Sequence, residues 1–107
     1  MASDWKFKDP KNHRVYTLRQ IMDDGAPILH VSHNSDDGAW QFLGWEAPKV
    51  EDGIVVCLEH IVEKDPSVVE LVELPLGWRA WRKRLTDPWI TEVDPDDPEV
   101  DEGSATY

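Results

Sequence analysis

The stretch ILHVSHNSDDGAWQFLGW, residues 28–45, decides the predicted fold. Its two ends, residues 28–33 and 40–45, have the apolar and aromatic composition of β-strands. Between them, Asn34-Ser35-Asp36-Asp37-Gly38 is a run of turn-forming residues. We therefore expect residues 28–45 to form a β-hairpin.

Before the hairpin, the sequence predicts a short helix over about residues 18–23. Thr17 and Gln20 have the spacing of a capping box, in which the threonine hydroxyl binds the third helical amide and the glutamine reaches back. Gly25 suits the C-terminal cap, because glycine readily takes a positive φ. The sequence thus predicts that the helix follows Thr17 directly.

After the hairpin, the sequence predicts one more strand, then helix, then a second hairpin. The third strand is expected over residues 54–57. Asp65-Pro66 has the residues of a helix start, since aspartate caps and proline suits the first helical position. GWRAWRKRL, residues 77–85, and Trp89-Ile90-Thr91 have strand composition and are separated by the turn residues Thr86-Asp87-Pro88.

This order of elements predicts an α+β fold. We expect a single domain with a mainly antiparallel sheet of about five strands and two or three short helices. Of the 22 acidic residues in this 107-residue chain, seven lie in residues 92–102, which hold no cation. Such a segment cannot bury enough apolar surface to fold. We therefore predict a loose N-terminal arm over residues 1–12, the α+β domain over 13–93, and an acidic, disordered tail over 94–107.

The progression of motifs along the chain resembles that of a known family. The motifs are Asp-Asp-Gly followed by Trp40-Gln41-Phe42, then Asp65-Pro66, then LPLGWRA at 74–80, then Asp87-Pro88-Trp89. They are similar to those of an uncharacterised family of small bacterial α+β domains, some relatives of which are described as predicted immunity proteins of polymorphic toxin systems. The resemblance spans residues 27–91. It implies a soluble binding protein, and it assigns no catalytic residue.

The sequence predicts a cytoplasmic protein. Cys57 is the only cysteine, so no disulfide can form within the chain. The N-terminus, MASDWKFKDP, lacks the apolar core of a signal peptide, and no apolar run has the length of a membrane span. Cys57 itself lies in an apolar run, which predicts a small buried side chain.

The second hairpin is basic although the chain carries a formal net charge of −11. In a strand, alternate residues face opposite sides, so its cations are divided between the two faces. We expect them to pair with acids on neighbouring strands, with their stems over Trp78 and Trp81. In a more specific variant, the acidic tail folds over this basic hairpin, whose cations are Arg79, Arg82, Lys83 and Arg84. The net charge argues against a nucleic-acid partner.

No motif in the sequence predicts catalysis, a metal or a cofactor. His30 and His33 lie near two aspartates, but an odd separation in a strand puts the two imidazoles on opposite faces. The glycines are isolated, so none forms a phosphate-binding loop. If the protein were an enzyme, the natural base would be His30, His33 or His60.

Two binding functions follow from these observations. In the first, a non-enzymatic protein-binding domain, in its specific form an immunity protein, docks an acidic and aromatic surface on a basic partner such as a toxin domain. The candidate anchors are Trp40, Trp45, Trp78 and Trp89, and the candidate acidic rim is Asp36, Asp37, Glu46 and Glu51. For any single one of these tryptophans, core packing is the expectation that an anchor role has to displace. In the second, a small molecule or peptide binds a tryptophan-lined cleft between the sheet and the helix of residues 65–74. We expect no membrane partner.

Overall fold

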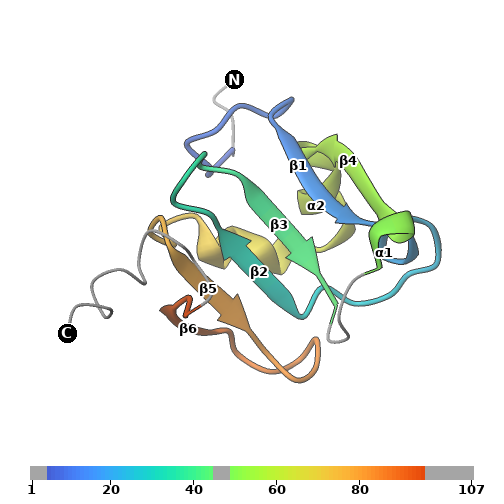
Figure 1. Cartoon of the computed structure of the whole chain (residues 1–107). Helices are drawn as coiled ribbons and strands as arrows, with labels where there is room; N and C mark the ends of the chain where they lie inside the picture. Colours follow the sequence, from blue (N-terminus) through green and yellow to red (C-terminus); the bar gives the residue numbers. More distant parts are fainter. Residues whose placement is uncertain (1–4, 45–48, 96–107) are drawn as a thin grey trace.

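The computed structural model describes residues 5–44 and 49–95. This part of the chain forms one domain, in which the helical segments of residues 58–64 and 66–71 lie behind one face of a β-sheet (Figure 1). The strands are β1 Arg14–Leu18, β2 His30–His33, β3 Trp40–Leu43, β4 Gly53–Cys57, β5 Trp78–Trp81 and β6 Ile90–Val93. The helical segments are α1 Arg19–Asp23, α2 Leu58–Lys64, and the 3-10 helices η1 Val50–Asp52 and η2 Pro66–Leu71.

The sheet is mixed, and its six strands have the order β4-β1-β3-β2-β5-β6. Four neighbouring pairs are antiparallel, and β1 runs parallel to β3. The α+β architecture is therefore present, but the predicted sheet of about five mainly antiparallel strands is corrected. Strand β1 causes both differences, because it adds a strand and inserts it beside β3 in the parallel sense.

Strand β1 was missed because the capping-box prediction was wrong. The N-cap of α1 is Leu18, and it makes no side-chain capping bond. Thr17 lies within β1, where its buried hydroxyl donates to the carbonyl oxygen of Phe42 at 2.8 Å. The side-chain amide of Gln20 donates to the carboxylate of Asp52 at 2.8 Å. Residues with capping spacing thus bind partners that are distant in the sequence.

The first hairpin is confirmed. Strands β2 and β3 pair antiparallel, with His33 opposite Trp40 and Val31 opposite Phe42. The amide of Asn34 donates to the carbonyl of Ala39 at 2.8 Å and closes the turn. Both strands are shorter than the predicted 28–33 and 40–45.

The predicted start of the second helical segment is also confirmed. Asp65 caps η2 through its carboxylate, which accepts from the amide of Ser67 at 3.0 Å, and Pro66 is the first residue of the helix. Before it, β4 pairs with β1 at one edge of the sheet. Cys57 ends β4 and is partly exposed, so the prediction of a buried cysteine is corrected.

The hydrophobic core lies between the sheet and the helical segments. The strands contribute alternate, inward-facing side chains, and Phe7, which precedes the first strand, joins them at 5% exposure. Fully buried members include Ile21, Val31, Phe42, Leu58, Ile61, Val68 and Ala80. This packing fixes the sheet relative to η2 and to the segment that follows it.

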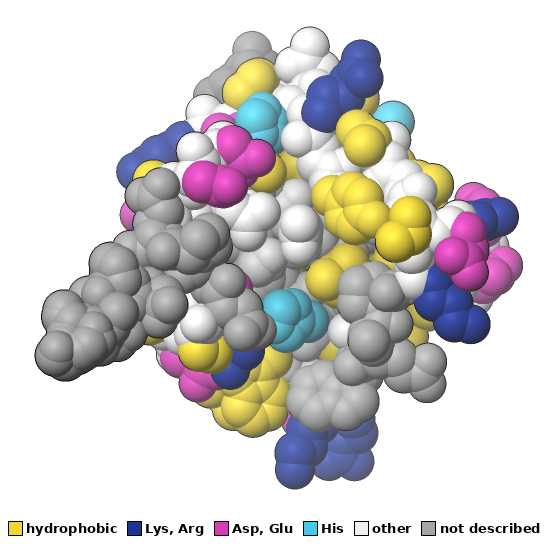
Figure 2. Space-filling model, in the orientation of Figure 1, with side chains coloured by type: hydrophobic (Ala, Val, Ile, Leu, Met, Phe, Trp, Pro, Cys, Tyr) yellow, Lys and Arg dark blue, Asp and Glu magenta, His cyan; other side chains and the backbone are white. Residues whose placement is uncertain are grey.

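The opposite face of the sheet is turned toward the viewer in Figures 1 and 2. Hydrophobic side chains gather there at the end formed by β1 and β4 (Figure 2), where Val55 of β4 is 58% exposed and lies opposite Tyr16 of β1. Toward the other edge, Arg79 of β5 pairs with Glu92 of β6, with 2.7 Å between Nε and the carboxylate.

The second hairpin forms from shorter strands than the sequence predicts. Strands β5 and β6 pair antiparallel, with Trp78 opposite Val93 and Trp81 opposite Ile90. Strand β5 ends at Trp81, so the strand predicted over 77–85 is shortened. Residues 82–85 therefore lie outside the strand, and their side chains do not follow the predicted alternation between the two faces of the sheet.

Candidate functional site

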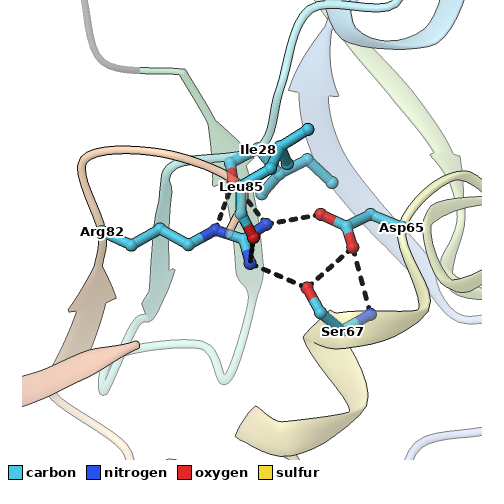
Figure 3. A network of polar contacts seen from close by, with 5 residues as sticks. All are labelled: Ile28, Asp65, Ser67, Arg82 and Leu85. Carbon is cyan, nitrogen blue, oxygen red and sulfur yellow. Dashed lines mark hydrogen bonds and ion pairs between the residues drawn. The ribbon is translucent and has the colours of Figure 1, made fainter. Parts of the chain in front are cut away.

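Arg82 is the most extensively bonded side chain of the basic hairpin (Figure 3). Its side chain is only 2% exposed and forms an ion pair with Asp65, at 2.6 Å. It donates twice to the carbonyl of Ile28, at 3.0 and 3.2 Å, and to Ser67 and the carbonyl of Leu85, at 2.9 and 3.2 Å. These five bonds use all five N–H groups of the guanidinium.

Arg82 therefore holds the fold together and is not part of an external basic surface. Its guanidinium also stacks over the ring of Trp89, with 3.9 Å to the ring centroid. Since Asp65 caps η2, one buried ion pair connects the end of β5 to the start of η2. Together with the hydrogen bonds to Ile28, this ion pair makes Arg82 join three separate segments of the chain.

The predicted role of the basic hairpin is corrected in part. Arg79 does pair with an acid on the neighbouring strand, Glu92. Arg82 instead pairs with a helix cap and stacks on Trp89, not on Trp78 or Trp81. Arg84 pairs with Asp87 in its own loop, at 3.7 Å, and Lys83 is exposed. The acidic tail from residue 96 onward lies outside the described residues.

A cleft of about 230 Å³ opens beside Trp40, and we call it the His33 cleft. Its walls come from three segments: residues 7–9, which include Lys8, the hairpin residues His33 and Trp40, and residues 72–76. His33 stacks on Trp40 with 3.9 Å between ring centroids, and Phe7 meets Trp40 edge-on at 5.4 Å. Trp40 is only 2% exposed, so it belongs to the core and reaches the cleft only at its edge.

Trp40, Asp9 and His33, three of the polar residues that line the His33 cleft, bond to partners within the fold. The indole N–H of Trp40 donates to the carboxylate of Asp9 at 2.8 Å. The Nδ1 atom of His33 lies 2.8 Å from the carbonyl oxygen of Leu74, which can only accept, so Nδ1 carries the proton in this contact. These bonds attach the N-terminal segment and residue 74 to the hairpin.

A second cleft of about 230 Å³ shares Leu74 and Pro75 with the first, and we call it the Trp78 cleft. Trp78 is half-buried and packs against the core while it lines this cleft. The rim carries the exposed acids Glu70 and Glu73. Sequence reasoning did not single out either acid; their signal in the sequence was the position at the end of a helical segment, just before LPLG.

The structure divides the other candidate residues among different places. Trp89 is half-buried beneath Arg82. Asp36 and Asp37 are exposed in the β2–β3 turn, whereas Glu51 lies in η1, before the strand that starts opposite Leu18. The acids therefore sit at opposite ends of the sheet and do not form one rim. Two further candidates, Trp45 and Glu46, lie outside the described residues.

Within residues 5–44 and 49–95, no group of three or more histidine, cysteine, aspartate or glutamate side chains could hold a metal ion. No helix in the same part of the chain is long and apolar enough to cross a bilayer. His33 lines the His33 cleft through a ring whose Nδ1 is bound to the carbonyl oxygen of Leu74.

Comparison with known proteins adds no relative: no family model, no curated protein and no solved structure matches the chain. The candidate site therefore rests on the geometry of the two clefts.

Proposed function

We propose that this chain is a non-enzymatic, cytoplasmic protein-binding domain that docks an acidic and aromatic surface on a basic protein partner. One observation carries the proposal: the two clefts share one wall, made by Glu73, Leu74 and Pro75. We call this region the 70–76 surface, and it consists of Glu70, Glu73, Pro75 and Leu76 together with Trp78.

The composition of the 70–76 surface supports a basic protein as the partner. Leu76 is 53% exposed and supplies apolar area beside the His33 cleft, while Trp78 supplies aromatic area in the other cleft. Aromatic and apolar anchors surrounded by charged residues are typical of binding hot spots. The formal net charge of −11 would speed the approach of a basic partner and disfavour an acidic one.

The specific form of the proposal is an immunity-type protein whose partner is a toxin domain, as the family resemblance implies. The arrangement of the cations supports a protein partner over a nucleic acid. Arg82 is buried and Arg79 is paired with Glu92, so these two arginines are not available to contact phosphates.

A binding module for a peptide or small molecule is the second candidate. The Trp78 cleft favours it, because that cleft lies between the end of η2 and strands β5 and β6, beside the predicted helix of residues 65–74. Clefts with apolar walls and few polar groups are typical ligand sites.

Site-specific photocrosslinking tests the protein-binding proposal. A photoreactive amino acid replaces Leu76, and a matched control replaces Val50, which is 91% exposed in η1 at the other end of the sheet. We expect a basic protein to crosslink from position 76 and not from position 50 in a lysate of the native cell, with a yield that falls as salt is added. Equal crosslinking from both positions, or none from position 76, would contradict the proposal.

A further inference from the structure

We infer that the Trp78 cleft binds an arginine side chain of the basic partner. This inference rests on the proposed function and names the chemical group that the 70–76 surface recognises. Three features of the cleft support it: an aromatic wall, two carboxylates at the rim, and a volume of about 230 Å³ that can admit a side chain.

The carboxylates of the cleft are available to a cation. Glu70 and Glu73 are both exposed, and neither forms an ion pair with any other residue that the structure describes. Glu70 lies in η2 and Glu73 two residues after its end, so both project from the same turn region beside Trp78. A cation in the cleft would thus meet two negative charges and the face or edge of an indole.

The aromatic wall favours arginine over lysine. A guanidinium is planar, stacks on indole rings and donates two parallel hydrogen bonds to a carboxylate, whereas an ammonium is a strongly hydrated point charge. The fold itself contains this combination: Arg82 lies 3.9 Å from the ring centroid of Trp89 and 2.6 Å from the carboxylate of Asp65. The Trp78 cleft offers the same two kinds of group, an indole ring and carboxylates, and the described residues that line it include no arginine.

The apolar residues of the cleft suit the aliphatic part of an arginine side chain. Leu71 and Leu74 are nearly buried, at 3% and 5% exposure, and line the cleft together with Pro75. Arginine stems pack along such apolar surface while the charged end stays near water and acids. An uncharged side chain of the same shape would gain the apolar contact alone.

Titration of the full-length, isotope-labelled protein tests this inference by NMR. The probe is N-acetyl-arginine methylamide, and the matched controls are the lysine and citrulline analogues, the latter being uncharged and nearly the same shape. We expect the arginine probe to shift the Trp78 indole N–H and the amides of residues 70–74. We expect it to bind at least about threefold more tightly than the lysine probe and about tenfold more tightly than the citrulline probe.

Variants of the acids make the test specific. Glu70→Gln with Glu73→Gln should weaken binding of the arginine probe by about fivefold or more. Glu59→Gln with Glu63→Gln removes the same charge from α2, outside the cleft, and should change the affinity less than twofold. If the two double variants weaken binding equally, general charge explains the effect and the inference is wrong.

Failure of the inference can be told apart from failure of the proposed function. A citrulline probe that binds as well as arginine, or shifts that miss Trp78, would overturn the arginine site while crosslinking from Leu76 still supported a protein partner. Binding of the arginine probe at Trp78 without any crosslinked partner would support the cleft chemistry and contradict the protein-binding function.

Discussion

Replacement of Arg82 by methionine should destabilise the protein more than any change to the exposed cations. Methionine keeps much of the apolar stem but removes five hydrogen bonds and the charge. It leaves the carboxylate of Asp65, 15% exposed, without its cationic partner and leaves the carbonyl of Ile28 without both guanidinium donors. Removing one member of a buried pair typically costs about 3–5 kcal/mol. That loss is a large share of the roughly 5–15 kcal/mol by which a domain is stable.

Urea denaturation followed by circular dichroism would measure this loss. The control is Arg84→Met, since Arg84 is 79% exposed and its pair with Asp87 spans 3.7 Å. We expect the control to lose less than about 0.5 kcal/mol. If Arg82→Met does not fold, Arg82→Lys, which keeps the charge but loses the planar donor array, should still fold with a loss between those two values.

A double-mutant cycle separates the ion pair from the packing of the arginine stem. Asp65→Asn keeps an oxygen that can cap Ser67 but removes the negative charge. Each single change leaves the charge of the other residue without its partner, whereas the double variant leaves no unpaired charge. We therefore expect the double variant to lose about 1–3 kcal/mol less stability than the sum of the two single losses. Equal losses for Arg82→Met and Arg84→Met, or strict additivity with Asp65→Asn, would refute the reasoning.

Three smaller changes test other parts of the fold. Thr17→Val removes the buried hydroxyl that donates to Phe42, and it should cost about 1–2 kcal/mol in urea denaturation, with Thr17→Ser closer to the parent. Gly77→Ala places a side chain at φ 82°, and it should lower the melting temperature by about 4–12 °C, for a cost of about 1–2 kcal/mol; an unchanged melting temperature would show that the turn relaxes freely. Trp40→Phe removes the indole N–H that donates to Asp9 and part of the ring that stacks on His33. It should lower the free energy of unfolding by about 1–3 kcal/mol in urea denaturation. An unchanged free energy of unfolding would show that the His33 cleft does not depend on this contact.

Local residue patterns were enough to predict several elements. The first hairpin and the Asp65 cap depend on neighbours in the sequence, such as the Asn-Ser-Asp-Asp-Gly turn and the Asp-Pro pair, and both are confirmed. The capping-box prediction at Thr17 was wrong because a local pattern does not show whether a more distant partner is available. Its spacing fits a local bond, but the bond to Phe42, 25 residues away, is made instead.

The candidate site was less accessible to sequence reasoning than the fold. Four tryptophans were equivalent as candidate anchors in the sequence, yet the structure buries Trp40 in the core, stacks Trp89 under Arg82 and leaves Trp78 in a cleft. The exposure of an aromatic ring depends on which elements pack over it. No pattern in the sequence around a tryptophan reports that packing.

The sequence by itself determined the α+β class, the two hairpins and the acidic balance, because turn chemistry, capping and charge act over a few residues. Tertiary structure alone decided that β1 enters the sheet parallel to β3, that Arg82 turns inward to Asp65, and that Glu70 and Glu73 meet Trp78 at a cleft. These outcomes depend on burial of one shared core, since side chains distant in the chain become neighbours only when the sheet and η2 close over it.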